Sequence, residues 1–261
     1  MVNKPMIGVA AVVLVVGVGI AYYFHGRSTL PSSEPAAMPP PPAASGEPPI
    51  EHPVPSSASS SSAPLPPLND SDPAVKDAVS TLIGANAMQY VVPEDIVRHV
   101  VVTIDNLPRQ KAPAAKRPTV AVPGQFLVEG DELHATLDPK NFARYDAMVN
   151  VVRQLDMQRV ADTYFRLYPL FQSAYQNLGY PNGYFNDRLV QVIDSLLATP
   201  QPRGPIELTR PNVLYTFADP KLEALPAGEK LLLRMGPDNA AVIKGKLKEL
   251  RAIITAAPPK H

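Results

Sequence analysis

The stretch from Met6 to Phe24 constrains this chain more than any other feature of its sequence. Its nineteen residues carry no charge and no strongly polar group. At a rise of about 1.5 Å per residue, such a helix is long enough to cross the hydrocarbon core of a bilayer. A cleaved signal peptide is the alternative, but its apolar region is usually shorter, and "AYYFHGR" stands where a small-residue cleavage site would be. The sequence therefore predicts a single transmembrane anchor within residues 1–27.

The charges that flank the predicted span favour one orientation. The amino group and Lys4 precede the span, whereas Arg27 follows it. Because positive charges near a span favour the cytoplasmic side, we expect a cytoplasmic amino terminus and an outward-facing carboxy-terminal part. In a bacterium this describes a single-pass inner-membrane protein with a periplasmic domain, so the membrane is the first predicted partner.

The segment 28–72 is rich in proline, serine and alanine. Fourteen of the 32 prolines of the chain fall between Pro31 and Pro73. With so few large apolar residues, the segment cannot bury a core, and it is predicted to be a disordered, partly polyproline linker. As a flexible coil of about 45 residues it would average roughly 40 Å from end to end. A proline-motif ligand for an SH3-like partner is the alternative interpretation.

Charge, cysteine and motif content exclude several function classes. From Asp70 onward, 22 basic residues face 21 acidic ones, so no whole-domain field would hold nucleic acid, and we expect no such partner. The absence of cysteine excludes disulfides and thiolate sites, and five scattered histidines give no metal-site pattern. The phosphate-loop, dinucleotide, H-E-x-x-H and G-x-S-x-G patterns are all missing. We therefore predict no metal and no cofactor, identify no catalytic residue, and favour a role other than catalysis.

Residues 73–256 are predicted to form one compact, mainly helical domain, followed by a disordered tail at 257–261. Apolar residues recur at helical spacing over about 73–84, 94–107, 139–155, 156–178 and 187–198, and in a final set of short helices split at Gly236. Within the long central helix, Tyr164, Tyr168, Phe171 and Tyr175 form one aromatic stripe. Because ten of the fourteen aromatic residues after the linker fall between Phe142 and Phe185, the central helices are expected to form the middle of the core.

Two regions of the domain show strand patterns instead. The segment "GQFLVEGDELHATLD" alternates apolar and polar residues around Glu129-Gly130-Asp131, which predicts a small β-hairpin. Short extended pieces are expected around residues 206–208 and 213–217. The predicted fold class is therefore mainly α, with a small β-hairpin and short extended segments, preceded by a transmembrane helix and a disordered linker.

The segment "LGYPNGYFNDR", which starts at Leu178, concentrates more chemistry than any other part of the domain. In a structural interpretation it is a turn that starts a helix, with Asn186 as the helix cap and Asp187 at the positive helix end. In a functional interpretation, seven residues edge a cleft for a polar envelope ligand such as a glycan or a peptide. These candidate ligand-binding residues are Tyr180, Tyr184, Asn186, Asp187, Arg188, Arg144 and Tyr145.

Several long blocks resemble a bacterial domain-of-unknown-function family of membrane-anchored proteins. They include "VVTIDNLPRQ", "LDPKNFARYDAMV", "RLYPLFQSAYQNLGYPNGYFNDRLVQVIDSLLATP", "VLYTFADPKLEAL" and "EKLLLRMGPDNAA", and the resemblance covers residues 65–255. It implies an amino-terminal span, a proline-rich linker and this helical domain in a Gram-negative envelope. It implies no activity and supplies no catalytic residue.

These observations lead to one main hypothesis and two alternatives. In the main hypothesis, the periplasmic helical domain is a binding or scaffolding module of the cell envelope, with envelope proteins or peptidoglycan as partners. In the first alternative, it is a cell-wall-active hydrolase with an acidic dyad. The dyad would be drawn from Glu94, Asp95, Asp105, Asp187 and Asp194. In the second alternative, it carries a lipid or small ligand in a pocket lined by the aromatic stripe.

Overall fold

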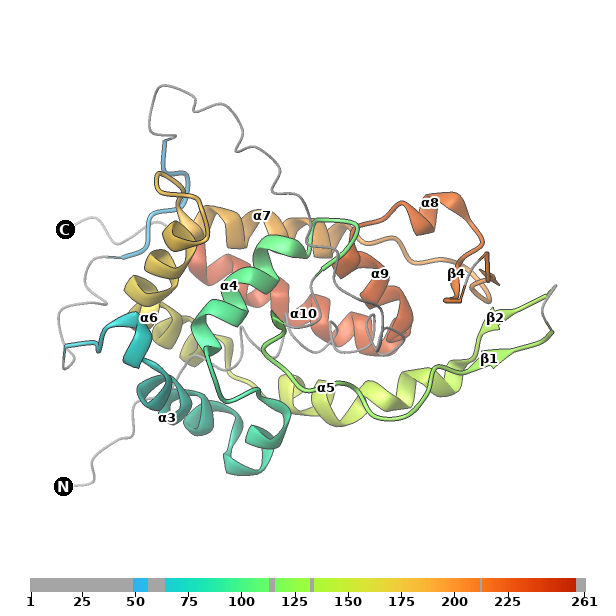
Figure 1. Ribbon diagram of the computed structural model, residues 1–261, viewed down its shortest axis with the longest axis horizontal. Coiled ribbons are helices and arrows are strands. Elements are labelled where there is room, and N and C mark those ends of the chain that lie inside the picture. Colours follow the sequence, from blue (N-terminus) through green and yellow to red (C-terminus); the bar gives the residue numbers. More distant parts are fainter. Residues whose placement is uncertain (1–48, 56–63, 113–115, 132–133, 212, 257–261) are drawn as a thin grey trace.

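A computed structural model provides the three-dimensional structure (Figure 1). It describes residues 49–55, 64–112, 116–131, 134–211 and 213–256. The predicted span at 6–24, most of the first half of the linker and the tail at 257–261 lie outside these ranges. None of the helices within the described ranges has both the length and the apolar character that a bilayer crossing requires.

The domain is mainly helical, as the sequence predicts. Its longest helices are α6 and α10, which lie alongside α7 in the middle of the molecule (Figure 1). In chain order the elements are η2 (Leu68–Asp70), α3 (Asp72–Ile83), η3 (Ala85–Tyr90), α4 (Ile96–Asn106), β1 (Val128–Glu129), β2 (Thr136–Leu137), η5 (Pro139–Tyr145), α5 (Asp146–Arg153), α6 (Met157–Asn177), α7 (Phe185–Ala198), β3 (Leu208–Thr209), β4 (Thr216–Phe217), α8 (Pro220–Glu223), α9 (Ala227–Arg234) and α10 (Pro237–Ile254).

The main core forms where α6, α7 and α10 meet, with α4 and α5 against them. The aromatic stripe of α6 lies at its centre, since Tyr164 and Phe171 are fully buried. Phe185, the first residue of α7, stacks on Phe171 with the ring centroids 5.7 Å apart. The prediction that the central helices form the middle of the core is therefore confirmed.

Two small antiparallel hairpins lie at one end of the molecule (Figure 1). The predicted hairpin is β1–β2, and the two predicted extended pieces pair with each other as β3–β4. The hairpins are also joined, because Leu137 N donates to Ile206 O at 2.9 Å and Leu208 N donates to Ala135 O at 2.8 Å. A small core of apolar residues, separate from the main core, lies beneath them.

Two stretches of the range predicted as linker lie against the domain. Leu65 and Leu68 pack on the main core, and the Asp72 carboxylate accepts hydrogen bonds from Asp95 N and Ile96 N at the start of α4. Residues 49–55, which we call the strap, have neither helix nor strand but contact the beginning of α7. The domain therefore includes these two stretches ahead of residue 73.

Candidate functional site

The connection between α6 and α7 is held tightly against the last turns of α6. The rings of Tyr175 and Tyr180 stack with their centroids 4.6 Å apart. A Cβ at Gly183 would lie 2.8 Å from the Tyr175 ring, so glycine allows the chain to approach this closely. Gln172 Nε2 donates to Gly183 O at 2.7 Å, and its Oε1 accepts from Phe185 N at 2.9 Å. We call residues 178–187 the corner.

Asn186 is the most deeply buried polar residue of the corner. Its Nδ2 donates to His52 O at 2.9 Å and to Ile254 O at 3.2 Å, while its Oδ1 accepts from the Tyr164 hydroxyl at 3.0 Å. The helix cap is Tyr184, which makes no side-chain cap bond. The prediction that Asn186 caps α7 was therefore wrong. The helix starts before Asn186, which joins α6, α10 and the strap.

The strap is held through its main-chain N–H groups. Both oxygens of the Asp187 carboxylate accept from successive strap residues, Oδ2 from Glu51 N at 3.1 Å and Oδ1 from His52 N at 2.7 Å. The Tyr184 hydroxyl accepts from Val54 N at 2.8 Å. With the Asn186 bond to His52 O, four hydrogen bonds join main-chain atoms of the strap to side chains of the corner. In Figure 1 the strap, in blue, lies beside the loop that connects α6 to α7.

The side chains of the strap contribute less to this contact. Ile50 is 54% exposed, and Glu51 is exposed as well. Val54 alone among the strap residues packs on the main core. Pro49, Pro53 and Pro55 lack an N–H group, so the donors come from the residues between them. The corner therefore recognises the course of a main chain more than a set of side chains.

Tyr180 and Arg188 face the end of α4 instead of the strap. Arg188 Nη2 donates to Asp105 O at 2.7 Å and lies 3.1 Å from Asp105 Oδ1. The Tyr180 hydroxyl donates to Asp105 Oδ2 at 3.3 Å, and Arg109 Nη2 donates to the same oxygen at 2.7 Å. Asp105 is only 3% exposed, so this cluster neutralises a buried carboxylate and ties the start of α7 to α4.

Arg144 and Tyr145 belong to a different part of the fold. They end η5, which follows β2 at the hairpin end of the molecule (Figure 1). Arg144 donates to Pro123 O at 2.9 Å and to Gly124 O at 2.8 Å, whereas Tyr145 is buried. The structure thus divides the seven predicted residues: three hold the strap, two join α7 to α4, and two end η5, where Arg144 holds the loop at 123–124 and Tyr145 belongs to the main core.

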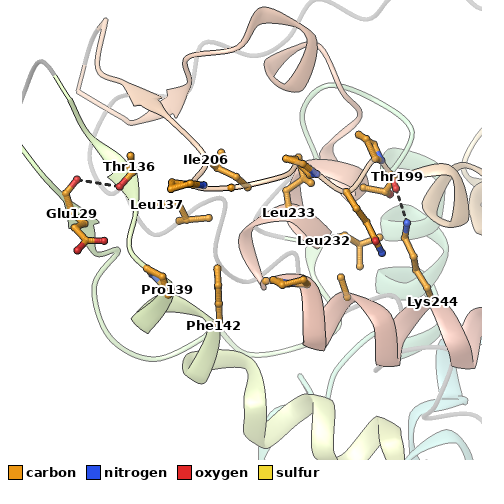
Figure 2. Close-up of a pocket in the computed structure, with 18 residues that line it drawn as sticks. Glu129, Thr136, Leu137, Pro139, Phe142, Thr199, Ile206, Leu232, Leu233 and Lys244 are labelled. Atoms are coloured by element: carbon orange, nitrogen blue, oxygen red, sulfur yellow. Dashed lines mark hydrogen bonds between the residues drawn. The ribbon is translucent and has the colours of Figure 1, made fainter.

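A hollow of about 380 Å³ lies at the hairpin end. We call it the hairpin pocket. Its walls come from the β1–β2 hairpin and η5, from the loop 199–206, and from the α9–α10 junction. Figure 2 shows Leu137, Phe142 and Ile206 on one side of the hollow and Leu232 and Leu233 on another. The sequence reasoning missed this pocket, because its apolar residues resemble ordinary core residues.

Lys244 stands at one end of the pocket and is the only cation among the described residues that line it. Its Nζ donates to Thr199 O at 2.6 Å, at the carboxyl end of α7 (Figure 2). Burial lowers the pKa of the Lys244 ammonium, and the charge of Glu229 partly offsets this effect. Glu129, the one acid that the described part of the chain contributes to the lining, lies at the opposite end.

The comparison with known families places most of the domain in one family. The model described as "Protein of unknown function (DUF3014)" matches residues 96–251, which is more than half of the 261 residues. The chain belongs to the DUF3014 family. The corner and the hairpin pocket both lie inside the DUF3014 region, whereas the strap precedes it. No curated protein and no solved structure gives a match.

Three of the acids considered for a catalytic dyad lie in the DUF3014 region, and each is already engaged. Asp105 is paired with Arg188 and Arg109, and Asp187 accepts from the strap. Asp194 accepts from Arg251 Nη2 at 2.9 Å. Within the described residues, no group of three or more histidine or acidic side chains has the arrangement of a metal site.

The aromatic stripe of the DUF3014 region packs on itself and does not line the hairpin pocket. Burial raises the pKa of Tyr164 and Tyr168 well above the ordinary value, and it raises the pKa of Tyr175 to about 12. The stripe hydroxyls therefore stay protonated. Tyr164 donates to Asn186, and Tyr168 donates to Gln172 Oε1 at 2.9 Å.

Proposed function

We propose that this protein is a single-pass inner-membrane protein whose periplasmic domain binds proline-flanked peptide segments of envelope proteins at the corner. The observation that carries the proposal is that corner side chains bind the main chain of the strap through four hydrogen bonds. Two successive N–H groups on one carboxylate form a charge-assisted contact, which is about twice as strong as a neutral hydrogen bond. In this proposal the strap occupies, within the same chain, the site where a partner peptide would bind.

Main-chain recognition suits a scaffolding role. Because the bonds use N–H and C=O groups, they tolerate different side chains and need only the correct backbone course. The prolines of the strap restrict that course in advance, which reduces the entropy lost on binding. Gln172 of α6 bonds to Gly183 and Phe185, and so holds the main chain that carries Tyr184, Asn186 and Asp187.

The strap would also compete with any partner. A segment joined to the domain has an effective concentration in the millimolar range for short flexible connections. A partner peptide must therefore bind more tightly than the strap or be present at a high local concentration, as in a membrane assembly. The predicted span ahead of the strap supports this setting, because a tethered domain meets its partners at one surface.

Peptide binding can be tested with the full-length chain in which the strap is released. Glu51→Pro and His52→Pro together remove the two N–H groups that donate hydrogen bonds to the Asp187 carboxylate. The ligand is a fluorescent peptide with the sequence of residues 48–55, PPIEHPVP. Anisotropy should show at least about tenfold tighter binding to the released variant than to the unaltered chain, whose corner is occupied.

Matched substitutions on α7 identify the contact. In the released background, Asp187→Asn should weaken peptide binding at least about tenfold, because it removes a charged acceptor. Asp194→Asn on the same helix should leave binding unchanged, since Asp194 faces Arg251. A peptide with Glu51→Gln should bind as well as the original. Equal binding to the released and unaltered chains, or no effect of Asp187→Asn, would show that the corner is not a peptide site.

The membrane placement has its own test. Alkaline phosphatase fused after His261 folds into an active enzyme only on the periplasmic side. The proposal expects an active fusion in the membrane fraction. An expressed but inactive fusion, or one recovered without the membrane, would refute the placement and leave the peptide experiment independent of it.

A further inference from the structure

We propose that the hairpin pocket binds a free medium-chain fatty acid, with the carboxylate at Lys244 and the alkyl chain along the apolar walls. This site is separate from the corner. The inference therefore does not depend on the proposed peptide binding.

The pocket walls favour an apolar ligand body. Its volume of about 380 Å³ lies near the lower end of the range for small-molecule pockets, which suits one alkyl chain better than a two-chain lipid. Five of the lining residues are prolines, which have no N–H to offer a ligand. They are Pro139, Pro200, Pro202, Pro205 and Pro237.

Lys244 supplies a single binding point for a charged head. An ammonium has three donors, and within the described residues the Lys244 ammonium has one acceptor, Thr199 O. None of the ion pairs among the described residues includes it. Glu229 acts on the Lys244 ammonium through its charge but forms no ion pair with it, so an anion brought by the ligand would complete the contacts of this cation.

The two ends of the pocket fix the direction in which the ligand lies. Glu129 stands opposite Lys244, so a carboxylate is repelled at one end and attracted at the other (Figure 2). Leu232 and Ala240 belong to the main core, whereas Leu137 and Leu233 belong to the small core. The alkyl chain would therefore occupy the seam between the two cores.

The test is photolabelling of the purified full-length chain with a decanoate that carries a diazirine near its tail. Labelled peptides should map to residues 129–142, 199–206 and 232–244. Unlabelled decanoate should compete, and its methyl ester and decylammonium should each compete at least about tenfold less well. The ester stands for the acyl chain of a lipid or an acylated protein, so this arm separates a free acid from an esterified chain.

Two lysines of α10 provide a matched pair. Lys244→Met should weaken competition by decanoate about tenfold, while labelling by a diazirine ester stays unchanged and shows that the pocket is intact. Lys246→Met should have no effect, because Lys246 donates to Leu155 O outside the pocket lining. Ala240→Phe should fill the hollow and abolish labelling by both probes.

Three results would overturn the inference. One is a label that maps outside the lining segments, and another is competition by the ester or by decylammonium that equals competition by decanoate. The third is an equal effect of Lys244→Met and Lys246→Met, which would mean that the Lys244 ammonium only holds the end of α7. Loss of ester labelling in Lys244→Met would point to the same structural role.

Discussion

The corner and the hairpin pocket lie at opposite ends of the molecule and are built from opposite kinds of residue (Figure 1). The corner is dense in tyrosine, asparagine and aspartate, and its polar groups bind α6 and the strap. The pocket is lined by prolines and aliphatic side chains, with one cation at its end.

This difference explains why the segment with the most polar and aromatic residues does not form the open hollow. Buried polar groups without partners are costly, so a dense polar cluster folds into mutual hydrogen bonds. At the corner, the strap completes that set. Rigid prolines and short hairpins cannot collapse onto one another in this way, and they leave a hollow where the main core and the small core meet.

The largest expected effect concerns the packing at the pocket wall. Gly236 has φ +85° and ψ 163°, a region that is essentially restricted to glycine, and an added Cβ would lie 2.5 Å from the Phe142 ring. Gly236→Ala should lower the free energy of unfolding by about 4 kcal/mol, from backbone strain and overpacking together. Chemical denaturation of the full-length chain measures the change.

Gly84 provides the matched control, because its φ is +80° and its ψ 152°, but nothing lies within 4 Å of the added Cβ. Gly84→Ala should therefore cost only the strain, about 2 kcal/mol. Adding Phe142→Ala to Gly236→Ala should remove the overpacking part of the loss. Equal losses for the two glycine variants would mean that the pocket wall adapts freely and is not rigid.

The next largest effect concerns the hydrogen bonds that stabilise the corner. Asn186→Ala removes a buried amide and leaves the Tyr164 hydroxyl and the Ile254 carbonyl without it. The free energy of unfolding should fall by about 3 kcal/mol. The strap should also lose protection against hydrogen exchange at His52 and Val54, which mass spectrometry can follow.

Asn182 lies in the exposed turn of the same corner and is the control for this substitution. Asn182→Ala should change the free energy of unfolding by less than about 0.5 kcal/mol. If Asn186→Ala were equally mild, the corner would be held by apolar contacts alone, and the contrast with the pocket would disappear.

Sequence patterns predicted the helices well and the two sites unevenly. The apolar spacing of the central and last helices follows directly from burial on one face, and α6, α7 and α10 lie where the spacing placed them. The residue types at the corner suggested both a turn and a ligand site. They could not show that Asn186 lies inside the core, because a cap and a buried amide use the same residue type at almost the same position.

The strap and the pocket depend on contacts between residues far apart in the chain. Asp187 and His52 are separated by 135 positions, and no periodicity links them. The strap also lies in a segment whose proline content predicts disorder, although Ile50 and Val54 are larger and more apolar than their neighbours. The pocket combines three segments of ordinary apolar residues, so only their arrangement in space distinguishes it from a core.

The smallest effect appears at high pH, where the two regions should respond in opposite directions. Burial raises the pKa of Tyr175 from its ordinary value of 10.0 to about 12. Above pH 10 the unfolded chain therefore ionises this tyrosine while the folded chain keeps the proton, so stability falls between about pH 10 and 12. Tyr175→Phe should make this decline shallower, as unfolding midpoints at pH 9, 10 and 11 would show.

Lys244 should act with the opposite sign. Burial lowers its pKa below the ordinary value of 10.5, so the folded chain releases this proton at a lower pH than the unfolded chain does. Between its lowered pKa and 10.5, the contribution of Lys244 to the free energy of unfolding therefore rises with pH. Lys244→Met should remove this rise, so the loss of stability at high pH should become steeper. If Tyr175→Phe and Lys244→Met shifted the slope in the same direction, burial would not be the cause of both pKa changes.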